Sequence, residues 1–166
     1  MDEDGAPPWL TSEQTRAWIA LASAVAWLPA SLEDQLQRDS GLSFVEYMVL
    51  SWLSMRPGRA GRMSEIAAMA NVRRSHLSRI AARLEARGWM RRDPDPDDGR
   101  ATLAVLTEAG LDTVVRAAPG HVAEVQRLVF DGLSPAQVDH LGQIGEHIVH
   151  AARPDLCLPS LDVTAG

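Results

Sequence analysis

The chain has 166 residues, enough for one domain whose hydrophobic core needs no disulfide or metal to hold it together. Its single cysteine, Cys157, excludes an intrachain disulfide, and no apolar run reaches the roughly 18 residues of a membrane span, so we expect a cytoplasmic protein without a membrane partner. The formal net charge of -6 argues against a nucleic-acid partner only until the charges are placed along the chain.

The positive charge is concentrated in one segment. All 16 basic residues are arginines, and ten of them lie between Arg56 and Arg92 against two acids. That segment carries a formal charge of +8, and the rest of the chain carries -14. Because phosphate attraction depends on the local field, this asymmetry is typical of a basic nucleic-acid-binding face on an acidic body. A solvated arginine-rich helix is the alternative interpretation.

The first 55 residues predict two helices. TSEQ (residues 11–14) and SFVE (43–46) have capping-box spacing, which starts a helix. The second helix, about 44–55, is apolar nearly all round and belongs to the core. Pro29 is expected to bend the first helix. The first helix also carries an apolar stripe at steps of three and four, formed by Trp18, Leu21, Val25, Leu28 and Leu32.

The middle of the chain predicts a helix-turn-helix followed by a β-hairpin wing. Ser64 is expected to cap a short helix ending near Ala70, and Asn71 to take the left-handed conformation of a tight turn. Gly88 is expected to end the second helix. Two short strands follow, at about 89–93 and 100–106. The inward face of the second helix consists of Leu77, Ile80, Ala81 and Leu84.

The last third predicts two more helices. Thr107 is the expected N-cap of a long helix interrupted at Pro119-Gly120, and SPAQ (residues 134–137) starts a final helix to about Ala152. The fold class is therefore mainly α with a small β-hairpin wing. The expected divisions are a dimerisation helix (1–42), a winged helix-turn-helix lobe (43–107), C-terminal dimerisation helices (108–152) and a mobile tail (153–166).

Three stretches resemble the MarR family of bacterial transcription regulators. They are GLSFVEYMVLSWL, MSEIAAMANVRRSHLSRIAARLEARGWMRR and DPDDGRATLAVLTEAG, and the Asp98-Gly99-Arg100 wing signature is the most specific part. The resemblance implies a winged-helix homodimer that binds pseudo-palindromic double-stranded DNA, usually represses genes, and is often released by a small aromatic or phenolic ligand. It also implies that Asp98 braces Arg100 or an arginine of the neighbouring helix.

The candidate DNA contacts lie on the second helix and in the wing. We expect Arg100 to reach the minor groove and Gly99 to allow the turn back into the second strand. The other wing acids are expected to keep the basic hairpin from binding every duplex non-specifically, with an acidic turn that simply stays in water as the alternative. Arg83 and Arg87 are expected to meet acids or backbone of the same protein. The outward residues of the second helix, which could read bases and phosphates in a major groove, are Arg73, Arg74, Ser75, His76, Ser78 and Arg79.

Two further groups of residues define the remaining predictions. Trp27, Tyr47 and Trp52 are candidates for an effector pocket between the lobe and the dimerisation helices, with core packing as the alternative. A metal sensor or metalloenzyme that uses the winged helix as an interaction module is the alternative function. It would use the histidines of the last helix, His140, His147 and His150, although a solvated or dimer-packed face is the simpler interpretation. We expect no cofactor, no metal site and no catalytic residues.

Overall fold

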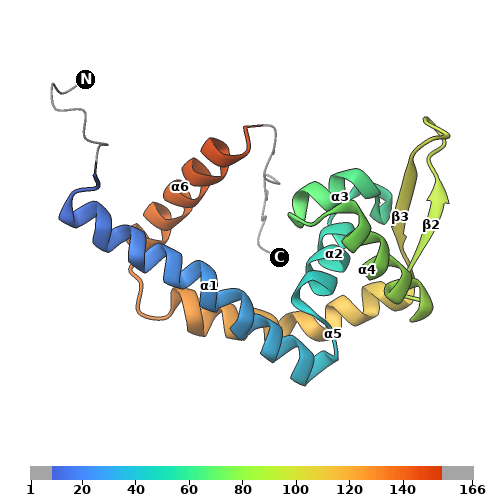
Figure 1. The fold of residues 1–166 in the computed structure, drawn as a ribbon. Helices are drawn as coiled ribbons and strands as arrows, with labels where there is room; N and C mark the ends of the chain where they lie inside the picture. Colours follow the sequence, from blue (N-terminus) through green and yellow to red (C-terminus); the bar gives the residue numbers. More distant parts are fainter. Residues whose placement is uncertain (1–8, 155–166) are drawn as a thin grey trace, which may run out of the picture.

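The computed structural model describes residues 9–154, so Cys157 and most of the predicted tail (153–166) lie outside the described residues. Two long helices, α1 (Ser12–Ser40) and α5 (Glu108–Val125), pack along each other and form the long axis of the molecule (Figure 1). Within the described residues, no helix combines the length and the apolar character needed to cross a membrane.

A lobe of short elements gathers at one end of the α1–α5 pair (Figure 1). It contains α2 (Phe44–Ser54), α3 (Met63–Met69) and α4 (Arg74–Ala86) together with a small sheet. Helix α6 (Pro135–Ala152) projects from the other end, and none of its residues is buried. The molecule is therefore divided into a packed lobe and an extended helical region.

The sheet has three strands rather than the two predicted. β2 (Met90–Pro94) and β3 (Thr102–Leu106) form the predicted wing hairpin, with Met90 opposite Leu106, and their ends lie within two residues of the predicted ends. β1 (Ala60–Arg62) pairs with the other edge of β3. The sequence RPGRAGR gives β1 no alternating pattern, so nothing but pairing with β3 identifies it as a strand.

The predicted helix starts are confirmed with one exception. Thr11, Ser43 and Ser134 each form a complete capping box, and the Thr107 side chain accepts from the backbone N–H three residues later. The prediction that Ser64 caps α3 is wrong, because α3 already begins at Met63. β1 runs directly into α3, so the N-cap residue is the last residue of a strand and makes no side-chain cap hydrogen bond.

The predicted turns are confirmed, and neither Pro29 nor Pro119 ends its helix. Asn71, between α3 and α4, has φ 49°, and Gly88, after α4, has φ 71°. Helix α1 continues through Pro29, and α5 continues through Pro119 to a π-helical turn at Gln126–Phe130. A proline removes one helical hydrogen bond, and the mutual packing of α1 and α5 keeps both helices continuous despite that loss.

The hydrophobic core lies inside the lobe and at its junction with α1 and α5. α2 is at its centre, as expected from its apolar sequence. The largest fully buried side chains are Leu36, Leu42, Leu50, Leu53, Ile66, Leu77, Ile80, Leu84 and Val49. By contrast, large apolar side chains on the first half of α1 and on α6 are exposed, so the two parts of the molecule differ in what they bury.

Candidate nucleic-acid interface

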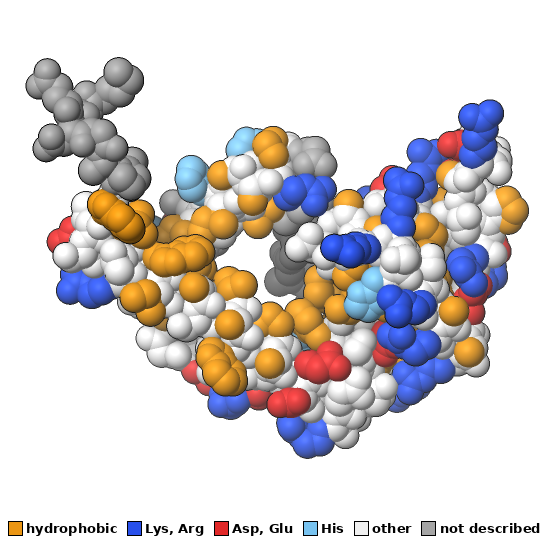
Figure 2. Space-filling model, in the orientation of Figure 1, with side chains coloured by type: hydrophobic (Ala, Val, Ile, Leu, Met, Phe, Trp, Pro, Cys, Tyr) orange, Lys and Arg blue, Asp and Glu red, His pale blue; other side chains and the backbone are white. Residues whose placement is uncertain are grey.

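Helix α4 has one buried face and one exposed face. Leu77, Ile80, Ala81 and Leu84 point into the lobe and are buried, as predicted from the sequence. All six predicted DNA contacts of this segment are on the exposed side: Arg73, Arg74, Ser75, His76, Ser78 and Arg79. In Figure 2 the arginine side chains gather over the lobe, in agreement with the charge asymmetry of the sequence. The structure therefore provides a basic, solvent-facing helix surface.

Among the described residues, no acidic or hydroxyl side chain caps the N-terminus of α4. Arg73 is the N-cap residue and makes no side-chain cap hydrogen bond, and the first turn contains no acid. Two arginines at the positive end of a helix dipole are intrinsically unfavourable. An anion bound at this end would complement both the dipole and the arginines.

Most of the arginines in the lobe already have acidic partners. Seven of the eleven arginines between Arg56 and Arg100 form ion pairs with carboxylates of the same chain. The four arginines in this range without such a pair are Arg73, Arg74, Arg79 and Arg100. All four are predicted DNA contacts. The arginines of this range that no carboxylate neutralises are therefore the ones expected to contact DNA.

A groove of about 360 Å³ separates α4 from the wing and the start of α3. Arg74 and Ser78 line it from α4, while Arg92 and Arg100 line it from the wing. Both walls therefore carry guanidinium groups. The Asp98 carboxylate also lines the groove and Arg92 is paired with Glu85, so Arg74 and Arg100 are the lining arginines that remain to attract an anion.

The tip of the wing is held by its backbone. The Asp98 carboxylate accepts a hydrogen bond from the backbone N–H of Arg100 at 3.1 Å, and the Ala101 N–H donates to the Asp98 carbonyl at 2.8 Å. Asp98 thus braces the turn at Arg100 through the main chain, and the Arg100 guanidinium forms no ion pair with any described acid. Gly99 has open space around it and no positive φ.

One wing acid, Asp95, is buried, so the alternative in which the wing acids simply stay in water does not hold for this residue. Its carboxylate accepts from the Arg62 Nε at 2.6 Å and from the Asp97 backbone N–H at 2.9 Å, and the residue is 5% exposed. The backbone hydrogen bond from Asp97, and then the Arg62 guanidinium, lower the pKa of Asp95. Asp95 therefore anchors the start of the wing loop to β1, whose strand character the sequence did not reveal.

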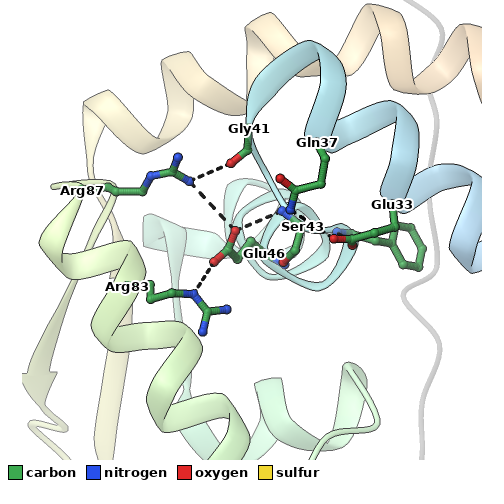
Figure 3. A network of polar contacts seen from close by, with 8 residues as sticks. Glu33, Gln37, Gly41, Ser43, Glu46, Arg83 and Arg87 are labelled. Atoms are coloured by element: carbon green, nitrogen blue, oxygen red, sulfur yellow. Dashed lines mark hydrogen bonds and ion pairs between the residues drawn. The ribbon is translucent and has the colours of Figure 1, made fainter.

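Arg83 and Arg87 bind groups of the same protein, as predicted. The Arg83 Nε donates to Glu46 at 2.8 Å, and the Arg87 guanidinium donates to the Gly41 carbonyl at 3.0 Å (Figure 3). Arg87 also lies 4.1 Å above the centroid of the Trp89 ring. The sequence did not single out Glu46 beyond its position in a capping box.

The three predicted pocket residues have different surroundings. Trp27 is 74% exposed on α1, whereas Tyr47 is buried with its ring 4.4 Å from that of His121 on α5. Trp52 lies under the Arg56 guanidinium and against Gly61 of β1. None of them lines the groove beside the wing or the pocket at the turn between α3 and α4.

The histidines of the alternative function lie exposed on α6. Across residues 9–154, no group of three or more histidine, cysteine, aspartate or glutamate side chains is placed to hold a metal ion. The structure therefore gives the metal-dependent alternative no ligand set to build on.

Comparison with known proteins gives a consistent family. Residues 40–101 match the model of the MarR family. The transcriptional repressor IacR of Pseudomonas putida is 31% identical over 121 residues, which cover 70% of this chain and 68% of that protein. Sco3205, a MarR family transcriptional regulator from Streptomyces coelicolor solved in complex with DNA, is 41% identical with a TM-score of 0.84, over 92% of this chain and 95% of that chain.

A second solved regulator, AbsC from Streptomyces coelicolor, is 34% identical with a TM-score of 0.82 and is matched over its whole length by 90% of this chain. Both solved regulators thus match the fold of this chain over at least 90% of its length. By its sequence, its winged helix-turn-helix and these likenesses, the chain belongs to the MarR family of transcriptional regulators.

Proposed function

We propose that the protein is a homodimeric, sequence-specific DNA-binding repressor that places one α4 helix of each subunit in the major groove. The observation that carries this proposal is the set of four arginines in the lobe without acid partners, Arg73, Arg74, Arg79 and Arg100. Neutralised arginines would attract phosphate weakly, whereas these four keep their full charge for a partner. The likeness to a regulator solved with DNA supports the same conclusion.

We assign base reading to Arg74 or Arg79 and backbone contacts to Arg73 and Arg100. Arg74 and Arg79 project from the exposed face of α4, where a bidentate contact to guanine contributes roughly 1–3 kcal/mol of discrimination. Arg73 precedes the uncapped N-terminus of α4, where a phosphate fits best. Ser75, His76 and Ser78 are exposed between them and would complete the contacts.

Selection of bound sequences from random duplex DNA tests this function. We expect a pseudo-palindromic site, and we expect Arg79→Ala or Arg74→Ala to relax the base preference at one position of each half-site. Arg16→Ala, an exposed arginine near the start of α1, is the control for loss of one charge. Equal weakening on selected and random DNA by both variants would make these arginines phosphate contacts.

A second copy of the chain is the proposed cover for the exposed apolar side chains. Trp18, Ile19 and Val25 on α1 are 59%, 58% and 65% exposed, and Ile144 on α6 is 56% exposed. Large apolar side chains exposed on the first half of α1 and on α6, outside the core, indicate a protein interface. A two-fold interface here would set two α4 helices about 34 Å apart, which is the spacing of successive major grooves.

Light scattering should report a dimer at micromolar concentration. Ile144→Glu should dissociate it and abolish operator binding, whereas Gln143→Glu, one residue away on the exposed surface of α6, should leave the dimer intact. A wild-type monomer that binds the selected site with full affinity would refute the dimer. The relative IacR is named a transcriptional repressor. Repression by this protein is tested with a reporter whose promoter contains the selected site.

We propose that an aromatic or phenolic effector binds where the lobe meets α1 and α5. Of the three predicted pocket residues, Tyr47 is the one at this junction, against His121. Two buried atoms there, Gln35 Oε1 and His121 Nδ1, have no hydrogen-bond partner among the described residues. Unpaired buried polar atoms are unfavourable, and a phenol or aromatic acid brings both a ring and polar groups to such a place.

Hydroxybenzoates and related aromatic acids are the probes for this effector site. Binding should raise the melting temperature and release the operator, and His121→Phe should abolish both responses. Trp27→Ala, which changes an exposed residue of α1, should abolish neither. A broad panel that neither stabilises the protein nor releases DNA would exclude such an effector.

A further inference from the structure

Three helices of this chain begin with a complete capping box, and one of them differs in a single residue. The residue that reaches back to the N-cap is Gln14 in α1 and Gln137 in α6, but it is Glu46 in α2. In the other two boxes a glutamine amide oxygen makes the same backbone hydrogen bond without a charge. The cap alone therefore does not require a negative charge at position 46.

The two oxygens of the Glu46 carboxylate have different partners, and one of these partners lies on α4. Oε2 accepts from the Ser43 backbone N–H at 3.0 Å, while Oε1 accepts from the Arg83 Nε at 2.8 Å (Figure 3). The Arg87 guanidinium lies 4.0 Å from the same carboxylate. Glu46 is 5% exposed, so its charge is shielded from water and is balanced by the two arginines on the last turns of α4.

These contacts join α4 to the corner between α1 and α2. Arg87 also donates to the carbonyl of Gly41, the left-handed residue that ends α1. On the other side of the corner, Glu33 of α1 accepts from the Phe44 backbone N–H at 2.5 Å (Figure 3). The end of α1, the start of α2 and the end of α4 are thus fixed to one another by directional polar contacts.

We infer that Glu46 is a positioning residue for DNA recognition: its carboxylate sets the orientation of α4 relative to α1 and α2. The inference rests on the proposed reading of DNA by α4. The first turns of α4 would contact the bases, whereas the contacts with Glu46 fix its last turns. A small rotation of α4 at its last turns would therefore move Arg74 and Arg79 relative to the bases. In a dimer, this link would also set the geometry between the two reading helices.

Glu46→Gln separates positioning from capping and from charge. Glutamine can keep the Ser43 hydrogen bond, as in the other two capping boxes, but its second terminal atom is then an amide NH2 group, which donates and cannot accept from Arg83. The change also makes the lobe more positive by one charge. Random duplex DNA should therefore bind equally well or more tightly, whereas the selected operator should bind about tenfold more weakly, as expected when an arginine–base contact loses its geometry.

Arg83→Gln provides the opposite charge change on the same contact. It makes the lobe less positive, yet it should lower the ratio of operator to random-DNA affinity by a similar factor. The double variant should lose no more of this ratio than either single variant, because both remove one interaction. Glu124→Gln is the matched control for Glu46→Gln: Glu124 pairs with Arg127 within the helical region, and its replacement changes the net charge by the same amount and sign.

The measurements are fluorescence anisotropy on both DNAs and the melting temperature of each variant. Support consists of a lowered affinity ratio in both single variants, no further loss in the double variant, and melting temperatures close to that of the wild type. An unchanged ratio in Glu46→Gln overturns the inference, as do losses that multiply in the double variant, which would mean that Arg83 touches DNA itself. A wild-type protein that prefers no sequence would fail at the proposed function, and the inference would fail with it.

Discussion

Replacing Arg100 with alanine removes a charge from the wing without removing a structural contact. Arg100 is exposed, and its guanidinium has no ion pair with a described acid. The turn around it is held by the Asp98 carboxylate and by the Ala101 N–H, and both hydrogen bonds involve backbone atoms at positions 100 and 101 that alanine retains. The variant should therefore fold with an unchanged melting temperature.

The expected effect on DNA binding follows from counterion release. Each neutralised phosphate contributes about 0.9 to the slope of log affinity against log salt, so a dimer that loses one contact per subunit should lose about 2 from the slope. Between about 50 and 200 mM salt, this difference changes the ratio of wild-type to variant affinity by about tenfold. The wild type should therefore have its largest advantage at low salt.

Fluorescence anisotropy on the selected operator at several salt concentrations measures this slope directly. Arg16→Ala, which removes an exposed arginine near the start of α1, should leave the slope unchanged. Equal slopes for the wild type and Arg100→Ala would refute the reasoning, since the wing tip would then lie away from the DNA backbone.

Three further changes test the fold. Gly110→Ala should lower the free energy of unfolding by roughly 1–3 kcal/mol in urea melts, because a Cβ there would overlap the Trp89 carbonyl. Gly142→Ala, where a Cβ has open space, should not lower it. Equal stability of the two variants would contradict this packing. The hydrogen bonds to Asp95 depress its pKa, so they stabilise the fold above about pH 4 and lose their effect as the pH falls further; Asp95→Asn should melt earlier at pH 7 and depend less on acid, and an unchanged melting profile would argue against the buried pair. Burial lowers the pKa of His121, so the fold favours its neutral form and should lose stability as the pH falls through about 6.5; His121→Phe should flatten that dependence, and equal pH dependence would contradict it.

Residue patterns confined to a few neighbouring positions were sufficient for much of the architecture. The capping boxes at Thr11, Ser43 and Ser134, the left-handed Asn71 and the end of α4 at Gly88 all appear where the sequence predicts them. These signals are reliable because each is satisfied by backbone groups within three or four residues. Charge placement along the chain likewise indicated the basic lobe, because the whole segment from Arg56 to Arg92 folds within the lobe.

Features that depend on distant partners could not be predicted in this way. The strand Ala60–Arg62 exists because β3 pairs with it, and the burial of Asp95 depends on Arg62, 33 positions earlier in the chain. The dual role of Glu46 likewise requires Arg83, which is 37 positions later. Which arginines are neutralised by acids and which remain for a partner was therefore decided by the tertiary structure, because ion pairing depends on distances in space that spacing along the chain does not determine.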